Sequence, residues 1–211
     1  MTNDFEKPLF FTEYTPNDSR VLNLMSGLGL ILTGGTAVEI LLNSEGFIPG
    51  RKRSENDFDY FYYTLDDKTL ARIKGFGFEL LSSTLDTYNF VLGSEIELDL
   101  LHNNNRYSSV NVGGIAIIEP ICFFISKFNR YLEFRLASTT RQDVVNKITT
   151  DEIDLLDLLR LFDRYGEQYV SKFELQMGQY INAIKSRINK TAAKVYLSEL
   201  VDKCMAGKPN H

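Results

Sequence analysis

The spacing of hydrophobic residues changes once along this chain, near residue 119. Before that point, short apolar runs with the alternation of strands are interspersed with short helical stretches. After it, the apolar residues recur with helical spacing and no alternation returns. We therefore expect an α/β (α+β) core over residues 1–119, built as a mixed sheet flanked by helices, and a helical C-terminal domain over residues 120–211.

The ends of the predicted elements are marked by glycine, proline and acidic capping residues. In the core, helices are predicted over 16–28, 36–42 and 68–74, and strands over 30–32, 57–61, 78–81, 88–92, 95–101 and 115–118. In the second part, helices are predicted over 121–132, 141–146, 151–163, 167–187 and 191–203. The segment 43–56 is predicted to be a loop because it contains Gly46, Pro49 and Gly50.

Composition narrows the class of protein. The 211 residues are 44% hydrophobic and 24% charged, as is ordinary for a globular chain with one sizeable core or two small domains. A net charge of −5 argues against a general nucleic-acid coat protein. No N-terminal run resembles a signal peptide and no stretch reaches the length of a membrane span. We therefore expect a cytoplasmic protein with no membrane partner.

Cysteine and histidine exclude several kinds of site. Cys122 and Cys204 have neither zinc nor redox spacing, which suits a reducing cytosol. His102 and His211 are too few and too far apart for a zinc site or for a catalytic triad that depends on histidine.

A glycine turn connects the first predicted strand to a helix at Gly34-Gly35-Thr36. Small residues at the start of a helix let backbone N–H groups approach a phosphate, and the helix dipole favours the negative charge. The alternative is a tight turn that binds no ligand.

Asp57 and Asp59 are two residues apart on a predicted strand, so both carboxylates project from the same face. Mg²⁺ prefers carboxylate oxygens, usually from one or two carboxylates together with substrate phosphates. The alternative is that this strand lies at a sheet edge with both aspartates solvated.

Asp99 supplies a third acidic position, on another predicted strand, with Glu97 on the same face. If this strand pairs with the strand of Asp57 and Asp59, Asp99 completes a metal site or acts as a general base on a hydroxyl. The alternative is a solvated sheet face, because the register of strands cannot be fixed from sequence.

These motifs together resemble the nucleotidyltransferase superfamily signature, which has a Gly-Gly turn followed by an Asp-hydrophobic-Asp strand. The segments LTGGTAVEILL and RKRSENDFDYF carry both motifs, and the GGTA start is similar to that of AbiEii-type toxins. The resemblance covers about residues 20–160. It implies a nucleotidyltransferase-like fold and transfer of a nucleotidyl group from an NTP to a hydroxyl, with Mg²⁺ or Mn²⁺ held by Asp57, Asp59 and Asp99. It also implies a toxin that acts on tRNA or another RNA and has an antitoxin partner.

The resemblance also implies residues that contact the nucleotide. They are Gly34, Gly35, Thr36, Arg53, Ser54, Lys127 and Arg130. For Lys127 and Arg130, which share a face of the predicted helix 121–132, the alternative is an ordinary solvated position. The last motif, a basic residue near an aspartate, is matched by Arg141, and its acid is either Asp143 or Asp154.

Two further functions remain open at this stage. One is a nucleotidyltransferase for a small molecule such as an antibiotic hydroxyl, and the other is a catalytically silent nucleotide-binding or interaction module. The lysines and arginines of the last two predicted helices form a solvated face or an RNA-binding surface. The intact set of three carboxylates argues against the silent module.

Overall fold

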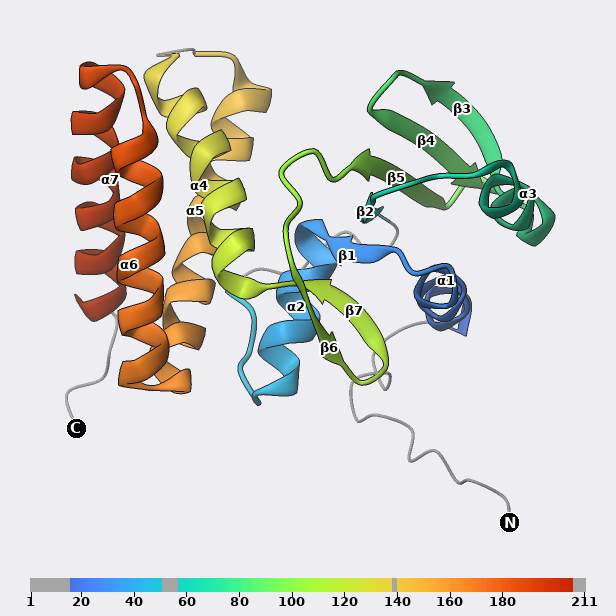
Figure 1. Ribbon diagram of the computed structural model, residues 1–211, viewed down its shortest axis with the longest axis horizontal. Coiled ribbons are helices and arrows are strands. Elements are labelled where there is room, and N and C mark those ends of the chain that lie inside the picture. The colour runs from blue at the N-terminus through green and yellow to red at the C-terminus, as the bar shows by residue number, and fades with distance from the viewer. Residues whose placement is uncertain (1–15, 51–56, 138–139, 207–211) are drawn as a thin grey trace. The chain divides into compact units, whose positions relative to one another are not determined.

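The computed structural model describes residues 16–50, 57–137 and 140–206. These residues contain seven helices and seven strands. The chain divides into two compact units, one formed by residues 1–48 and 52–119 and the other by Pro49–Arg51 with Pro120–His211. The first unit holds all the strands and the second holds four helices (Figure 1).

The strands form one mixed sheet in the order β3-β4-β5-β2-β1-β7-β6 (Figure 1). They are β1 (Ile31–Thr33), β2 (Asp57–Tyr62), β3 (Glu79–Ser83), β4 (Thr87–Leu92), β5 (Ile96–His102), β6 (Ser109–Val112) and β7 (Ile115–Ile118). β2 is parallel to β5 and β1 is parallel to β7, while the other neighbours are antiparallel. This mixed sheet with helices confirms the predicted fold class.

Three helices belong to the same unit as the sheet: α1 (Pro16–Gly27), α2 (Gly34–Ser44) and α3 (Asp67–Phe76). α2 starts directly after β1 and packs on β1 and β2. α3 begins where the Asp66 carboxylate accepts a hydrogen bond of 2.7 Å from the Thr69 backbone N–H, and ends at Gly77, whose φ is 116°. An acidic residue, Asp66, and a glycine, Gly77, therefore cap the two ends of α3.

Buried apolar residues and more exposed residues alternate along β2 and β5, so the sheet has a buried face and a polar face. Phe58, Tyr60, Leu98 and Leu100 are at most 1% exposed and belong to the core. The residues between them point to the opposite face, because successive side chains of a strand alternate. That opposite face carries the acidic residues of both strands.

The second unit consists of α4 (Pro120–Leu136), α5 (Gln142–Tyr165), α6 (Glu167–Ala183) and α7 (Arg187–Ala206). α5 packs on each of the other three helices. The core between them is aromatic, and Phe124 contacts Phe128, Phe162 and Phe173 with ring centroids 4.9–6.0 Å apart. In the described residues, no helix is both long enough and apolar enough to cross a membrane.

The structure corrects two predicted elements. Residues 141–146 and 151–163 were expected as separate helices, but α5 runs through both. In its middle, Thr149 and Thr150 donate hydrogen bonds to backbone carbonyls of the same helix, so their hydroxyls are satisfied without ending it. β6 was not predicted; it pairs with β7 through a tight turn whose glycines, Gly113 and Gly114, have φ values of 58° and 88°.

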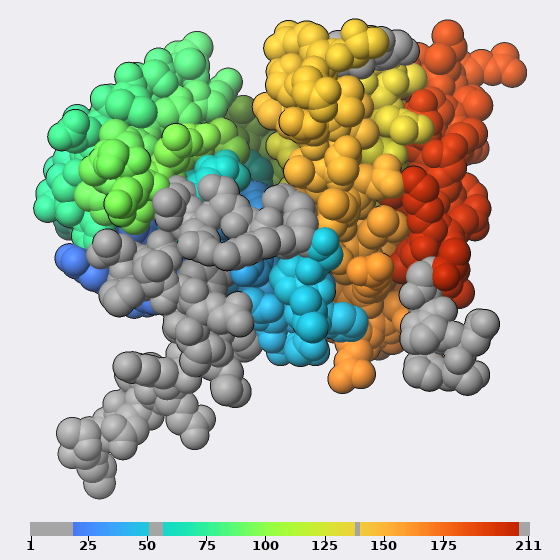
Figure 2. All heavy atoms as spheres, turned by 180° about the vertical axis from the view of Figure 1, so that it is seen from behind, coloured from blue at the N-terminus to red at the C-terminus, as the bar shows by residue number. Residues whose placement is uncertain are grey.

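The outer strand β3 is exposed at every residue and lies at the surface in the green part of Figure 2. Its pairing with β4 is interrupted by one irregularity, between Leu80 and Ser82. Because of that irregularity, Ser82 of β3 is the residue paired with Asn89 of β4.

Candidate active site

The predicted acidic residues lie on the two central strands of the sheet. β2 pairs with β1 on one side and β5 on the other, so the alternative that Asp57 and Asp59 occupy an edge strand is wrong. The parallel pairing of β2 with β5 sets Asp57 opposite Glu97 and Asp59 opposite Asp99. Because paired residues share a face, all four carboxylates project from the polar side of the sheet.

The closeness of these carboxylates affects their ionisation. Partial burial raises the pKa of Asp57 above its ordinary value, and the negative charges of Asp99 and Glu97 raise it further. Asp57 and Glu97 are exposed, whereas Asp59 and Asp99 are half-buried. A cation bound on this face would relieve the mutual repulsion of the carboxylates.

The glycine turn lies against this acidic face. Gly34 has a φ of 67°, and a Cβ atom built on it would lie 1.9 Å from Oδ2 of Asp59. Only glycine fits at this position, because any side chain would collide with the carboxylate and the backbone conformation is itself unfavourable for other residues. The beginning of α2 is therefore held in direct contact with one of the predicted metal ligands.

The first turn of α2 keeps the anion-binding character expected of a helix N-terminus. The N-cap residue, Thr33, makes no capping hydrogen bond with its side chain. Thr36 is buried, and its hydroxyl donates a 3.2 Å hydrogen bond to the backbone oxygen of Asp57. The side chain of Thr36 thus ties α2 to β2, and its predicted contact with a phosphate would come from the backbone N–H.

Lys127 and Arg130, the predicted phosphate contacts on α4, are bound to aspartates of α5. Lys127 is 5% exposed, and its Nζ lies 2.7 Å from Oδ2 of Asp154 and 3.6 Å from Oδ1 of Asp151. Arg130 donates from Nε to Oδ2 of Asp151 at 2.8 Å. Their contact with a nucleotide stays a prediction.

Asp143 and Asp154 are the two candidates for the acid of the last motif. Their surroundings in the structure are opposite. Asp143 is exposed and lies 2.8 Å from the Arg141 guanidinium, whose hydrogen bonds lower the pKa of Asp143. Asp154 is fully buried and is the aspartate next to Lys127. Arg53 and Ser54, which were also predicted to contact the nucleotide, lie outside the described residues.

Sequence reasoning missed two polar residues beside the acidic face. Asn89 of β4 donates from Nδ2 to Oδ1 of Asp99 at 2.5 Å, and Ser82 of β3 donates to Oδ1 of Asn89 at 2.7 Å. Asparagine is depleted in strands, so its presence inside the predicted strand 88–92 was the available signal.

The chemistry of the acidic face suits a hard divalent cation. Carboxylate oxygens are the ligands that Mg²⁺ and Mn²⁺ prefer, and Mg²⁺ commonly takes one or two carboxylates with substrate phosphates completing its coordination. Within residues 16–50, 57–137 and 140–206, no group of three or more His, Cys, Asp or Glu side chains is arranged to hold a metal ion. A metal held jointly by Asp57, Asp59 and Asp99 therefore stays a prediction, and a substrate phosphate would have to supply further ligands.

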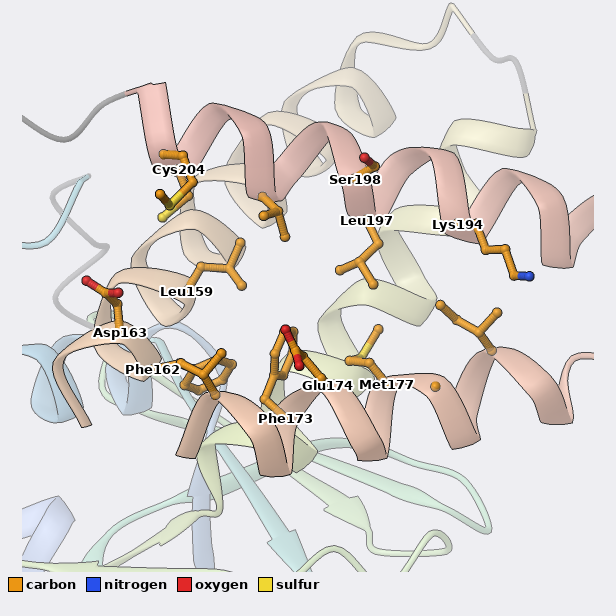
Figure 3. Close-up of a pocket in the computed structure, with 15 residues that line it drawn as sticks. Leu159, Phe162, Asp163, Phe173, Glu174, Met177, Lys194, Leu197, Ser198 and Cys204 are labelled. Atoms are coloured by element: carbon orange, nitrogen blue, oxygen red, sulfur yellow. The ribbon is translucent and has the colours of Figure 1, made fainter. Parts of the chain in front are cut away.

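The helical unit contains a hollow of a different kind. A groove of about 490 Å³ lies between α5, α6 and α7, with side chains such as Leu159, Phe173, Met177 and Leu197 directed into it (Figure 3). Its lining is mainly apolar and includes none of the predicted site residues. The candidate active site is therefore on the polar face of the sheet.

No protein-family model matches the sequence, and no curated protein matches it. Solved structures that match are nucleotidyltransferases, at sequence identities that establish likeness of fold alone. The chain therefore has a nucleotidyltransferase-like fold, as its sequence predicted. Membership of the AbiEii-type group stays a prediction.

Three of the matching structures are as follows. The match to Megavirus polyadenylate synthase covers 69% of this chain and 30% of the synthase chain, at 15% identity and a TM-score of 0.50. The antibiotic-resistance factor ANT(2'')-Ia matches 78% of this chain and 91% of its own, at 13% identity and a TM-score of 0.50. The lincosamide antibiotic adenylyltransferase LnuA, bound to lincomycin, matches 70% of this chain and 98% of its own, at 15% identity and a TM-score of 0.46.

Proposed function

We propose that this chain is a metal-dependent nucleotidyltransferase that moves a nucleotidyl group from an NTP to a hydroxyl acceptor. One observation carries the proposal. Asp59 faces Asp99 across the two central strands, while Gly34, at the start of a helix, lies against the Asp59 carboxylate. The proposal is supported because carboxylate oxygens, the kind of ligand that Mg²⁺ prefers, lie next to the start of a helix, where backbone N–H groups suit a phosphate.

In this proposal the carboxylates of Asp57, Asp59 and Asp99 hold Mg²⁺ or Mn²⁺. When bound, the metal supplies Lewis-acid stabilisation of the charge that develops on the phosphoryl oxygens and the departing pyrophosphate. The backbone N–H groups of Gly34, Gly35 and Thr36 bind the triphosphate. Asp99 also accepts the proton of the attacking hydroxyl, as a general base.

The proposal extends to four further nucleotide contacts, Arg53, Ser54, Lys127 and Arg130. The cationic groups of Lys127 and Arg130 are already engaged with Asp154 and Asp151, so a phosphate would have to share these charges. Because exchange of a buried ion-pair partner is costly, we give Lys127 and Arg130 a smaller part in binding than the glycine turn.

We propose RNA, such as tRNA, as the acceptor, and a toxin paired with an antitoxin as the biological role. The support is the resemblance of the motifs to AbiEii-type toxins, and the likeness of fold to a polyadenylate synthase. Neither of the two cysteines, Cys122 and Cys204, forms a disulfide, which supports a cytoplasmic location. An antibiotic hydroxyl is the second candidate acceptor, because the antibiotic-resistance factor ANT(2'')-Ia has the same kind of fold.

The test is transfer of label from each α-³²P-labelled NTP, with Mg²⁺, to total RNA or to a panel of aminoglycosides and lincosamides. We expect label in RNA, and loss of transfer when EDTA is added. Asp59→Asn should lower the rate by about a thousand-fold, because a metal contribution of several kcal/mol is worth a factor of ten for each 1.4 kcal/mol or so. If label enters the antibiotics alone, the acceptor is an antibiotic hydroxyl and RNA is excluded. If label enters neither class of acceptor, the proposal is overturned.

A further inference from the structure

A row of polar side chains crosses four strands of the sheet at the level of Asp99. Asp99 is paired with Asp59 of β2 on one side and with Asn89 of β4 on the other. Asn89 is in turn paired with Ser82 of β3. Because residues directly opposite in neighbouring strands share a face, Ser82, Asn89, Asp99 and Asp59 form one row on the polar side of the sheet.

Hydrogen bonds give this row a direction. The Ser82 hydroxyl donates to Oδ1 of Asn89 at 2.7 Å, and Nδ2 of Asn89 donates to Oδ1 of Asp99 at 2.5 Å. The reverse orientation of the amide would set its oxygen against a carboxylate oxygen, and two acceptors repel each other. Ser82 thus stabilises the one amide orientation in which Asn89 can donate to Asp99.

A β-bulge brings Ser82 into the row. Along β3, Glu79 is paired with Val91 and Leu80 with Phe90, so regular pairing would set Leu81 opposite Asn89. The register instead shifts by one residue, and Ser82 takes that place. Bulges re-aim side chains and are frequent next to active sites, so this one replaces an apolar side chain with a hydrogen-bond donor.

We propose that Asn89 is a positioning residue for Asp99, and that Ser82 acts through Asn89. The inference rests on the proposed function, in which Asp99 binds metal and accepts a proton. By holding Oδ1, the amide of Asn89 fixes the rotation of the carboxylate and directs Oδ2 to the reaction. As a neutral donor it does so without the positive charge of a lysine, so the face keeps the negative charge that attracts a cation.

The first test compares Asn89→Ala with Thr87→Ala in the full chain. Thr87 lies two residues before Asn89 on the same face of β4, but its hydroxyl is hydrogen-bonded to the hydroxyl of Thr84 at 2.7 Å. At saturating Mg²⁺, we expect Asn89→Ala to lower kcat by about 10–100-fold, the usual effect of losing such a partner, with an unchanged KM for the NTP. Thr87→Ala should retain the wild-type kcat. Asn89→Asp, which keeps the size but removes the donor, should lose at least as much as Asn89→Ala.

A double-mutant cycle tests the role of Ser82. Ser82→Ala should lower kcat less than Asn89→Ala, and adding it to Asn89→Ala should cause no further loss, because Ser82 acts only through Asn89. Additive losses would contradict that part of the proposal. If Asn89→Ala matches Thr87→Ala while Asp99→Ala is inactive, the positioning role of Asn89 is overturned.

Two readouts separate this inference from the proposed function. The side-chain amide resonances of Asn89 should move in Asp99→Ala and in Ser82→Ala but not in Thr87→Ala, and this needs no acceptor. Mn²⁺ affinity, measured with MnCl₂ at a saturating concentration of NTP and without an acceptor, should fall about 10–100-fold in Asn89→Ala. If the wild type transfers no label, unchanged amide resonances and unchanged Mn²⁺ affinity would overturn the positioning role independently.

Discussion

Two groups of carboxylates in this molecule have opposite charge surroundings. In the helical unit, Asp151 and Asp154 are at most 1% exposed, and they face the cationic groups of Lys127 and Arg130. On the sheet, Asp57 is exposed, yet the charges that raise its pKa are those of other carboxylates, Asp99 and Glu97. The first group is balanced within the fold, whereas the second concentrates negative charge on one face.

Burial alone therefore does not locate a functional acid in this molecule. The most deeply buried aspartates are those whose charges are matched by neighbouring cations, as expected if they hold helices together. On the sheet, the charges of Asp99 and Glu97 disfavour the ionised form of Asp57, and this favours binding of a cation there. The predictions below test this comparison, beginning with the largest effect.

Removal of the lysine ammonium should be the most damaging change to stability. Lys127→Ala would leave the buried Asp154 without the lysine ammonium that lies 2.7 Å from it, and we expect a loss of about 3–5 kcal/mol in the free energy of unfolding. Denaturant unfolding followed by circular dichroism measures it. Lys127→Met combined with Asp154→Asn should recover most of the loss, because together the two substitutions remove both charges of the buried pair. Wild-type stability of Lys127→Ala would show that the helical carboxylates are not balanced in this way.

Gly34→Ala should cause the second-largest loss of stability, and Gly29→Ala is its matched control. Both glycines have similar positive φ values, 67° and 72°, but a Cβ on Gly29 meets nothing within 4 Å whereas one on Gly34 meets Asp59. We expect Gly29→Ala to lose about 1–2 kcal/mol of stability from backbone strain alone. Gly34→Ala should lose more and should also lose Mg²⁺–NTP binding in calorimetry. Equal behaviour of the two variants would argue against a tight contact between α2 and Asp59.

A smaller effect concerns Asp57, whose ionised form is disfavoured by partial burial first and then by the charges of Asp99 and Glu97. Since the fold raises the pKa of Asp57, the folded state holds that proton more tightly than the unfolded state does, and stability falls as pH rises through the interval above the ordinary value of about 3.9. Asp57→Asn removes this penalty. Without metal, it should be more thermostable than the wild type at pH 7, and the difference should vanish at pH 3. A variant less stable than the wild type at pH 7 would contradict the repulsion.

The smallest effect should follow removal of the exposed pair. Arg141 and Asp143 are 2.8 Å apart, about as close as Lys127 and Asp154, but their side chains are 74% and 57% exposed. Solvent weakens such a pair, so Arg141→Ala should unfold at the wild-type denaturant concentration. A clear loss of transfer in this variant without a loss of stability would assign the last motif to Arg141 and Asp143.

The sequence predicted the α/β core, most strands and the acidic positions, because those depend on local periodicity and turn chemistry. It could not predict the register that sets Asp59 opposite Asp99, which depends on pairing between distant strands. Nor could it predict that Lys127 is buried against Asp154, since that depends on how α4 packs on α5. The bulge that brings Ser82 to Asn89 could not be predicted either, because it depends on how β3 pairs with β4.

We propose that the acidic face of β2 and β5 binds a metal with an NTP. The measurement is calorimetric titration of each Mg²⁺–NTP into the wild type and into the double variant Asp57→Asn with Asp59→Asn, with Thr87→Ala as a folded control. We expect the wild type and Thr87→Ala to bind the same NTP with equal affinity. The double variant should bind at least about 100-fold more weakly, as a loss of about 3 kcal/mol requires. Equal affinity of the double variant and the wild type would contradict the account.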